Sequence, residues 1–131
     1  MFSKLKILVA AVAIVVGAGL ASGTAPAKAQ GQLLESYVAF IGPNDHFNSR
    51  GGRLTEPWQI IRQDRANFHK FGIRDRGDQA DGYFNSIKNR GRMERMIRNG
   101  YIEPNAAWRI VNQNVWVRVD IYRNAVNVTV D

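Results

Sequence analysis

The chain has 131 residues, with 18 Lys and Arg against 11 Asp and Glu, two histidines and no cysteine. The missing cysteine excludes disulfides, thiol chemistry and a lipid anchor of the kind attached to a cysteine. Stability must therefore come from packing, a ligand or a partner.

The first 29 residues have the three parts of a cleavable signal peptide. Lys4 and Lys6 precede an uncharged apolar run, residues 7–20, which is shorter than the roughly 20 residues of a membrane-spanning helix. Ala27-Lys28-Ala29 then fits a signal peptidase site. We expect cleavage after Ala29, export to the periplasm or the medium, and no stable membrane anchor afterwards. Loss of Lys4, Lys6 and Lys28 lowers the net charge from +7 to +4.

Residues 30–131 are long enough for one domain with a single core. The β-branched and aromatic segment 35–41 predicts a strand that ends at Gly42-Pro43, and a glycine-rich loop follows over 42–54. Thr55-Glu56-Pro57 predicts the start of a helix that runs to Phe71 and ends at Gly72.

A polar loop is expected over 72–82, followed by short helices over 83–88 and 92–99. Residues 104–112 are compatible with a helix or a strand. Strict alternation of valine and isoleucine with polar residues over 115–122 and 126–130 predicts an antiparallel hairpin. The predicted fold class is α+β: a small antiparallel sheet of the first strand and this hairpin, with two to three short helices on one side.

Asp64 is the unusual residue of the first helix. On a helical wheel that starts at Trp58, the apolar side chains cover about 200° to 360°, and Asp64 falls at about 240°. A carboxylate that faces the core needs a partner. The expected partner is Arg50, Arg53 or Arg74, or backbone amides of the 42–54 loop.

Two histidines allow one catalytic hypothesis. If His46 and His69 flanked a phosphate as base and acid, with Asp64 nearby, the domain would be a metal-independent phosphodiesterase or ribonuclease. No histidine pair has metal-binding helical spacing, and Asp75, Asp78 and Asp81 do not match a calcium loop. We therefore expect those three acids to be solvated turn and helix-capping residues, and no metal or cofactor.

Three surfaces are candidates for binding. The first is the 42–54 loop with Asn48, Arg50 and Arg53, and the second is the polar side of the hairpin. That side carries Trp116, Arg118 and Tyr122. The third is a basic strip of Lys88, Arg92, Arg95 and Arg98, for which an ordinary solvated helix face is the simpler interpretation.

The favoured hypothesis is an exported, non-enzymatic binding or structural domain of the cell envelope or extracellular space. Its partner would be an anionic envelope polymer or another protein. The alternative is the small secreted phosphodiesterase that uses the two histidines.

Overall fold

The structure is a computed structural model that describes residues 31–131, so the predicted signal peptide lies outside the described residues. The elements in chain order are β1 (Leu33–Ile41), the 3-10 helix η2 (Pro43–His46), α2 (Pro57–Ala66), the π-helix η3 (Asn67–Phe71), α3 (Ile87–Arg90), α4 (Met93–Asn99), β2 (Tyr101–Ile102), α5 (Pro104–Asn112), β3 (Val115–Tyr122) and β4 (Val126–Val130).

The four strands form one mixed sheet in the order β1-β3-β4-β2. β1 and β4 each pair antiparallel with β3, whereas β2 pairs in parallel with β4. The α+β class, the first strand and the hairpin are thus confirmed. The expectation of a purely antiparallel sheet was wrong at β2, because a strand of two residues is too short to show period-two alternation.

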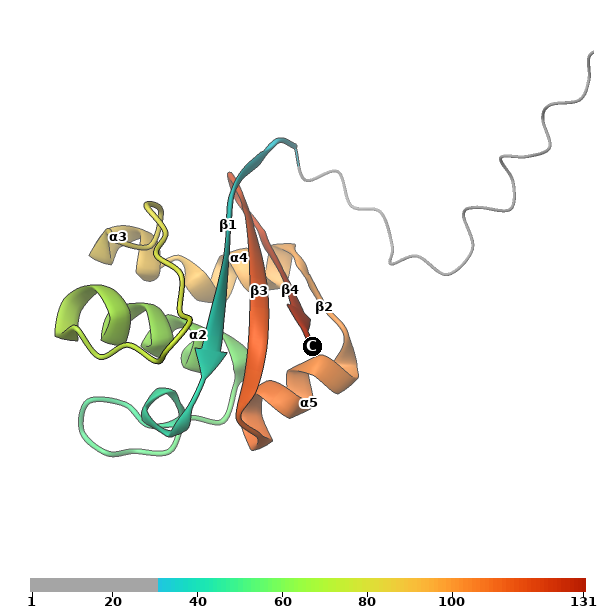
Figure 1. Cartoon of the computed structure of the whole chain (residues 1–131). Coiled ribbons are helices and arrows are strands. Elements are labelled where there is room, and N and C mark those ends of the chain that lie inside the picture. The colour runs from blue at the N-terminus through green and yellow to red at the C-terminus, as the bar shows by residue number, and fades with distance from the viewer. Residues whose placement is uncertain (1–30) are drawn as a thin grey trace, which may run out of the picture.

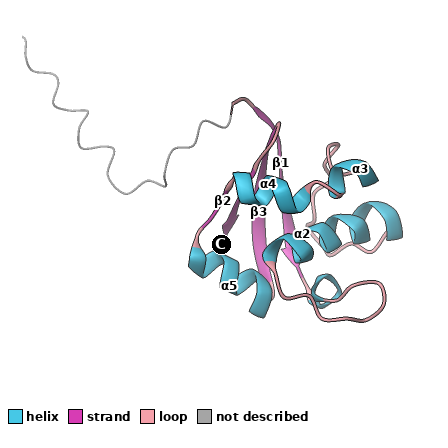
Figure 2. Ribbon diagram, turned by 180° about the vertical axis from the view of Figure 1, so that it is seen from behind, coloured by secondary structure: helices cyan, strands magenta, loops and turns pink. Residues whose placement is uncertain are grey.

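The helices cover a single face of the sheet (Figures 1 and 2). Residues 104–112, which were ambiguous from sequence, form α5, and α2 to α5 are four α-helices in the described part rather than two to three. The opposite face of the sheet carries no helix of the described residues. This arrangement leaves the polar side of β3 outside the main core.

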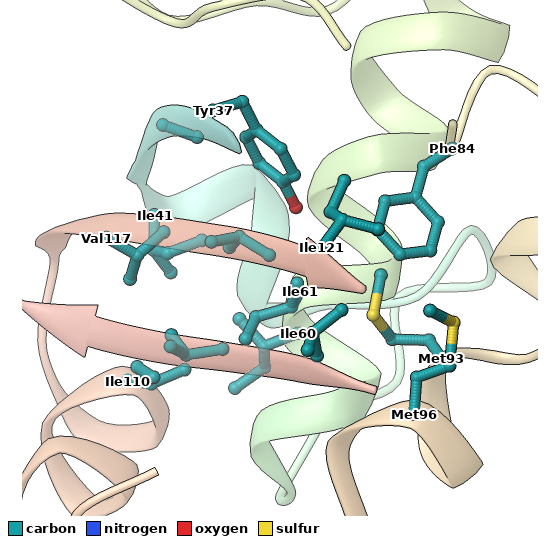
Figure 3. Close-up of a cluster of buried hydrophobic side chains, with 14 of the residues drawn as sticks. Tyr37, Ile41, Ile60, Ile61, Phe84, Met93, Met96, Ile110, Val117 and Ile121 are labelled. Carbon is teal, nitrogen blue, oxygen red and sulfur yellow. The ribbon is translucent and has the colours of Figure 1, made fainter. Parts of the chain in front are cut away.

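The core lies between the sheet and α2, α4 and α5. Figure 3 shows Ile41, Val117 and Ile110 at one end of the cluster, and Phe84 beside two methionines at the other. The alternating valines and isoleucines of β3 are buried, as the hairpin pattern predicted. Burial of each such side chain contributes roughly 1.5–3 kcal/mol, which accounts for stability without disulfides.

The first long helix changes its winding along its length. Glu56 rather than Thr55 is the N-terminal cap, and the Gln59 side chain accepts hydrogen bonds from both of their amides. The α-helix ends at Ala66 and continues as a π-helix to the predicted stop at Gly72, whose φ is 69°. The wider π turn shifts the angular position of later side chains. Phe71, which falls at about 220° on the wheel and so within the apolar arc, is consequently 46% exposed.

The two short helices begin later than predicted. Ser86 caps α3 by accepting a hydrogen bond from the Asn89 amide, and residues 83–86 form turns before it. α4 begins at Met93 instead of Arg92. The start of α3 is therefore set by the capping hydroxyl of Ser86 and not by the apolar pattern that began at Tyr83.

The loop over 72–82 closes the free edge of β1. The Asp78 carboxylate accepts a hydrogen bond from the Phe40 amide, and Gln79 bonds both the amide and the carbonyl of Val38. The Glu35 carboxylate accepts the amides of Gly82 and Tyr83. The unpaired backbone groups of an open strand edge are a template for aggregation. Here the loop occupies those groups on β1.

None of the helices in the described part of the chain is long and apolar enough to cross a membrane.

Candidate functional site

Arg65 is the centre of a buried polar network that joins α2 to the 72–82 loop. Its side chain is 0% exposed and lies against the rings of Tyr37 and Phe68, at 4.0 and 4.6 Å from the guanidinium carbon to the ring centres. Arg65 Nε donates to Asp64 at 2.8 Å, and Nη1 donates to Asp81 at 2.8 Å and to the Gln79 carbonyl at 3.0 Å.

Asp64 is buried, 3% exposed, and paired with an arginine, but not with one of the expected residues. Arg65, the next residue in the chain, takes the role assigned to Arg50, Arg53 or Arg74. Arg53 instead donates to the Val111 carbonyl, and Arg74 lies over Phe68. The helical wheel could have indicated this partner, because Arg65 falls at about 340°, inside the apolar arc. A buried arginine beside a buried aspartate supplies its partner without any contribution from a loop.

The two carboxyl groups around Arg65 differ in charge. Burial raises the pKa of Asp64 to about 8, although Arg65 opposes this shift. Burial by itself would also raise the pKa of Asp81. Hydrogen bonds from His69, Arg65 and the Phe84 amide outweigh that effect and hold the pKa below its usual value. Asp81 therefore carries the negative charge that balances Arg65, whereas burial favours the protonated form of Asp64, which has one side-chain hydrogen-bond donor among the described residues.

A second polar group ties the 42–54 loop to the helices. The buried Asp45 carboxylate accepts the Gly42 amide at 2.9 Å and the Asn67 side-chain amide at 2.9 Å. The Gln63 side-chain NH₂ donates in turn to the side-chain oxygen of Asn67. Burial raises the pKa of Asp45, against the effect of these two donors. The start of this glycine-rich segment is ordered by Asp45 rather than by Asp64.

The two histidines belong to separate hydrogen-bond groups. His46 is 4% exposed, and its Nδ1 and Nε2 each lie 3.0 Å from a backbone carbonyl, those of Gly42 and Ile110. His69 Nε2 lies 2.8 Å from Asp81. No hydrogen bond among the described residues joins the two rings. His46 holds the first loop on α5, whereas His69 belongs to the Arg65 network.

Two adjoining pockets form a groove along the outer side of α2 and η3, which we call the α2 groove. One pocket has a volume of about 290 Å³ and the other about 330 Å³, and both include Ser49, Gln63 and Phe71. The first is completed by Arg62, Ala66, Lys70, Ile87, Arg90 and Gly91. The second is completed by Pro43, Asn44, Phe47, Asn48, Asn67 and Ile73.

The α2 groove is cationic at one end and neutral at the other. Arg62, Lys70 and Arg90 line the first pocket, and no acidic residue lines either pocket. Within the described residues, none of these three cations forms an ion pair. Arg62 and Lys70 are exposed, whereas Arg90 is buried and its Nη1 donates to the Phe84 and Asn85 carbonyls. The charges available to an anionic ligand are therefore those of Arg62 and Lys70.

Sequence reasoning placed Asn48 on a binding surface, and it does line the groove. Asn48 also shapes the loop, because its carbonyl oxygen accepts the amides of Arg50 and Gly52. Arg50 is exposed beside it in the chain, and Arg53 lies over the Phe47 ring at 5.6 Å. The cations Arg62 and Lys70 were missed, because they fall at about 40° and 120° on the wheel, outside the apolar arc, where exposed polar side chains are ordinary.

The polar face of the hairpin forms a separate surface. Trp116 packs against Phe40, with ring centres 5.2 Å apart, and Gly77 of the loop lies against its edge. Arg118 pairs with Asp120 at 3.0 Å, and Asp120 also accepts from the Ser36 hydroxyl. Trp116 is only 36% exposed and Tyr122 is half-buried. Intramolecular contacts thus use part of the predicted recognition face.

The predicted basic strip extends over two helices. Lys88 lies in α3, Arg92 precedes α4, and Arg95 and Arg98 lie in α4. Arg98 forms the expected pair with Glu94. Because Gly91 separates the helices, the strip is not a continuous helix face.

The loop acids have structural roles, and the expectation that they are solvated was wrong for Asp81, which is buried. Asp78 caps the β1 edge, and Asp81 is buried in the Arg65 network. Burial and Asp78 together raise the pKa of Asp75. No group of three His, Asp or Glu residues in the described part is placed to hold a metal ion.

Comparison with known proteins found no matching family model, no matching curated protein and no matching solved structure.

Proposed function

We propose that the chain is exported and that residues 30–131 act as a small, non-enzymatic domain that binds an anionic polymer of the cell envelope or its surroundings. The observation that carries this proposal is the α2 groove, in which Arg62 and Lys70 are exposed, no acidic residue lines the pockets, and neither cation has an ion pair among the described residues. Guanidinium and ammonium groups in a concave surface attract phosphate and other anions.

Export is supported by the signal-like segment 1–29, and intact-mass measurement tests it. After expression of the full chain in a bacterium, protein from the envelope fraction is expected to begin at Gln30. A mass that retains residues 1–29 would contradict cleavage.

Binding is tested with fluorescently labelled inorganic polyphosphate and the exported protein. Replacement of the two exposed groove cations, Arg62→Gln with Lys70→Gln, is expected to weaken binding at least tenfold at low salt, because two phosphate contacts are lost. The matched control removes two exposed cations outside the groove, Arg95→Gln with Arg123→Gln. An equal loss in both double variants would show that only net charge matters and would overturn the assignment to this groove.

The second candidate is the metal-independent phosphodiesterase. One observation favours it: Asp81 orients the His69 ring through Nε2 at 2.8 Å, and Nδ1 has no hydrogen bond among the described residues. An oriented imidazole with a free nitrogen is suited to proton transfer. Incubation with single-stranded RNA, with and without chelator, tests this role. Cleavage that His46→Ala or His69→Ala abolishes would replace the binding proposal with the enzymatic one.

A further inference from the structure

We infer that the ligand of the α2 groove is single-stranded nucleic acid, with a base in the neutral pocket and the phosphate backbone along the cationic pocket. This inference rests on the proposed function and specifies its ligand. It starts from the fact that the two pockets differ in chemistry although they share Ser49, Gln63 and Phe71.

The neutral pocket has the components that recognise a base. Phe47 and Phe71 are 44% and 46% exposed, so each presents part of its ring to solvent, while Arg53 lies 5.6 Å from the centre of the Phe47 ring and Lys70 lies 5.1 Å from the centre of the Phe71 ring. Base stacking on an aromatic side chain contributes about 1–3 kcal/mol per base. No charged residue lines this pocket, and its volume of about 330 Å³ lies within the range of small-molecule sites.

Free hydrogen-bonding groups accompany the two rings. The side-chain oxygen of Asn48 accepts two backbone amides, whereas the side-chain NH₂ group of Asn48 makes no hydrogen bond among the described residues. Gln63 donates to Asn67 and leaves its own carbonyl oxygen free. Two residues that line the pocket thus keep one donor and one acceptor without a hydrogen bond among the described residues, which suits the polar edge of a base.

The cationic pocket fits the sugar-phosphate backbone. Arg62 and Lys70 are eight residues apart, which corresponds to roughly 10–12 Å along a helix axis. Stacked nucleotides follow each other at about 3.4 Å, so this distance corresponds to three or four nucleotides. Neither cation has a carboxylate partner in the described residues.

Two other ligands fit less well. A lipid acyl chain would bury the amides of Gln63 and Asn67 against hydrocarbon, which is unfavourable for polar groups. A duplex hides its bases from an aromatic surface, so the two phenylalanine rings would contribute nothing. Single-stranded nucleic acid uses the rings, the amides and the cations together.

The test compares two labelled 12-residue strands of equal backbone charge, oligo-dT and an abasic oligomer, in fluorescence anisotropy with the exported protein. Oligo-dT is expected to bind at least tenfold more tightly than the abasic strand, and more tightly than a 12-base-pair duplex. Phe71→Leu should remove most of the difference between oligo-dT and the abasic strand while leaving abasic affinity within about twofold. Phe47→Leu is the second variant, should Phe71→Leu fail to fold by circular dichroism.

Trp108→Leu removes an exposed aromatic side chain on α5, outside the groove, and should leave the preference unchanged. Equal affinity of the parent for oligo-dT, the abasic strand and polyphosphate would overturn the base pocket and leave the anionic-polymer function in place. A tighter complex with the duplex would also overturn it. Failure to bind any of these polyanions would overturn the proposed function itself.

Discussion

Replacement of Asp64 by asparagine should remove a pH dependence from the stability of the fold. The folded state holds a proton on Asp64 up to about pH 8, because burial raises the pKa of this carboxyl to about 8 from 3.8. The unfolded chain loses that proton near pH 4. Between these values the folded state binds more protons, so the free energy of unfolding falls as the pH rises.

The magnitude follows from the pKa shift. One pKa unit corresponds to about 1.4 kcal/mol, and linkage over the interval from pH 5 to pH 8 gives a loss of about 3–4 kcal/mol from Asp64. Asparagine has nearly the same shape, can accept the hydrogen bond from Arg65 Nε and has no proton to lose. Asp64→Asn should therefore lose less stability than the parent over this interval, by about that amount.

The assay is urea denaturation of the parent, Asp64→Asn and the control Asp75→Asn at several pH values from 5 to 8. Asp45, Arg65 and Asp78, which act electrostatically on Asp64, are present in all three proteins and their contributions cancel to first order. In Asp75→Asn the free energy of unfolding should fall with pH nearly as steeply as in the parent. Identical slopes for the parent and Asp64→Asn would refute the assignment of a buried, protonated carboxyl.

Other changes test the same structure through equilibrium unfolding. Asp64→Ala should cost about 2–4 kcal/mol, because it strands a buried donor of Arg65, whereas Asp75→Ala should cost less than about 1 kcal/mol. Arg65→Lys should cost about 3 kcal/mol or more, since a lysine cannot bond Asp64, Asp81 and Gln79 at once; a cost below 1 kcal/mol would contradict the network. His46→Ala should cost about 1–3 kcal/mol by removing the ring that contacts the Gly42 and Ile110 carbonyls, of which Gly42 keeps the Asp45 amide; no loss would mean that the ring does not hold the first loop. Gly100→Ala should cost about 3 kcal/mol or more, because a Cβ would lie 1.6 Å from the Val126 carbonyl oxygen. Gly82→Ala, where a Cβ meets only ordinary contacts, should stay within about 1 kcal/mol, and similar costs for both glycines would contradict the close packing at Gly100.

Several features of this protein could be read from the sequence because they depend on local periodicity. Alternation along 115–122 and 126–130 determines which face of the hairpin is buried, and the structure has the valines and isoleucines of both strands in the core. Gly72 ends the first helical segment because its positive φ is favourable only for glycine. The wheel position of Asp64 likewise determined its burial.

The tertiary structure decided the partners of those residues and the groove. Arg65 meets Asp81 and Gln79 across 16 and 14 residues of chain, and nothing in the helical period indicates where the 72–82 loop returns. The π-helix turned Phe71 outward, and the 42–54 loop then placed Phe47 and Asn48 beside it. Helix periods and capping are encoded within a few neighbouring residues, but a groove depends on how separate segments pack, and that packing is set by the whole core.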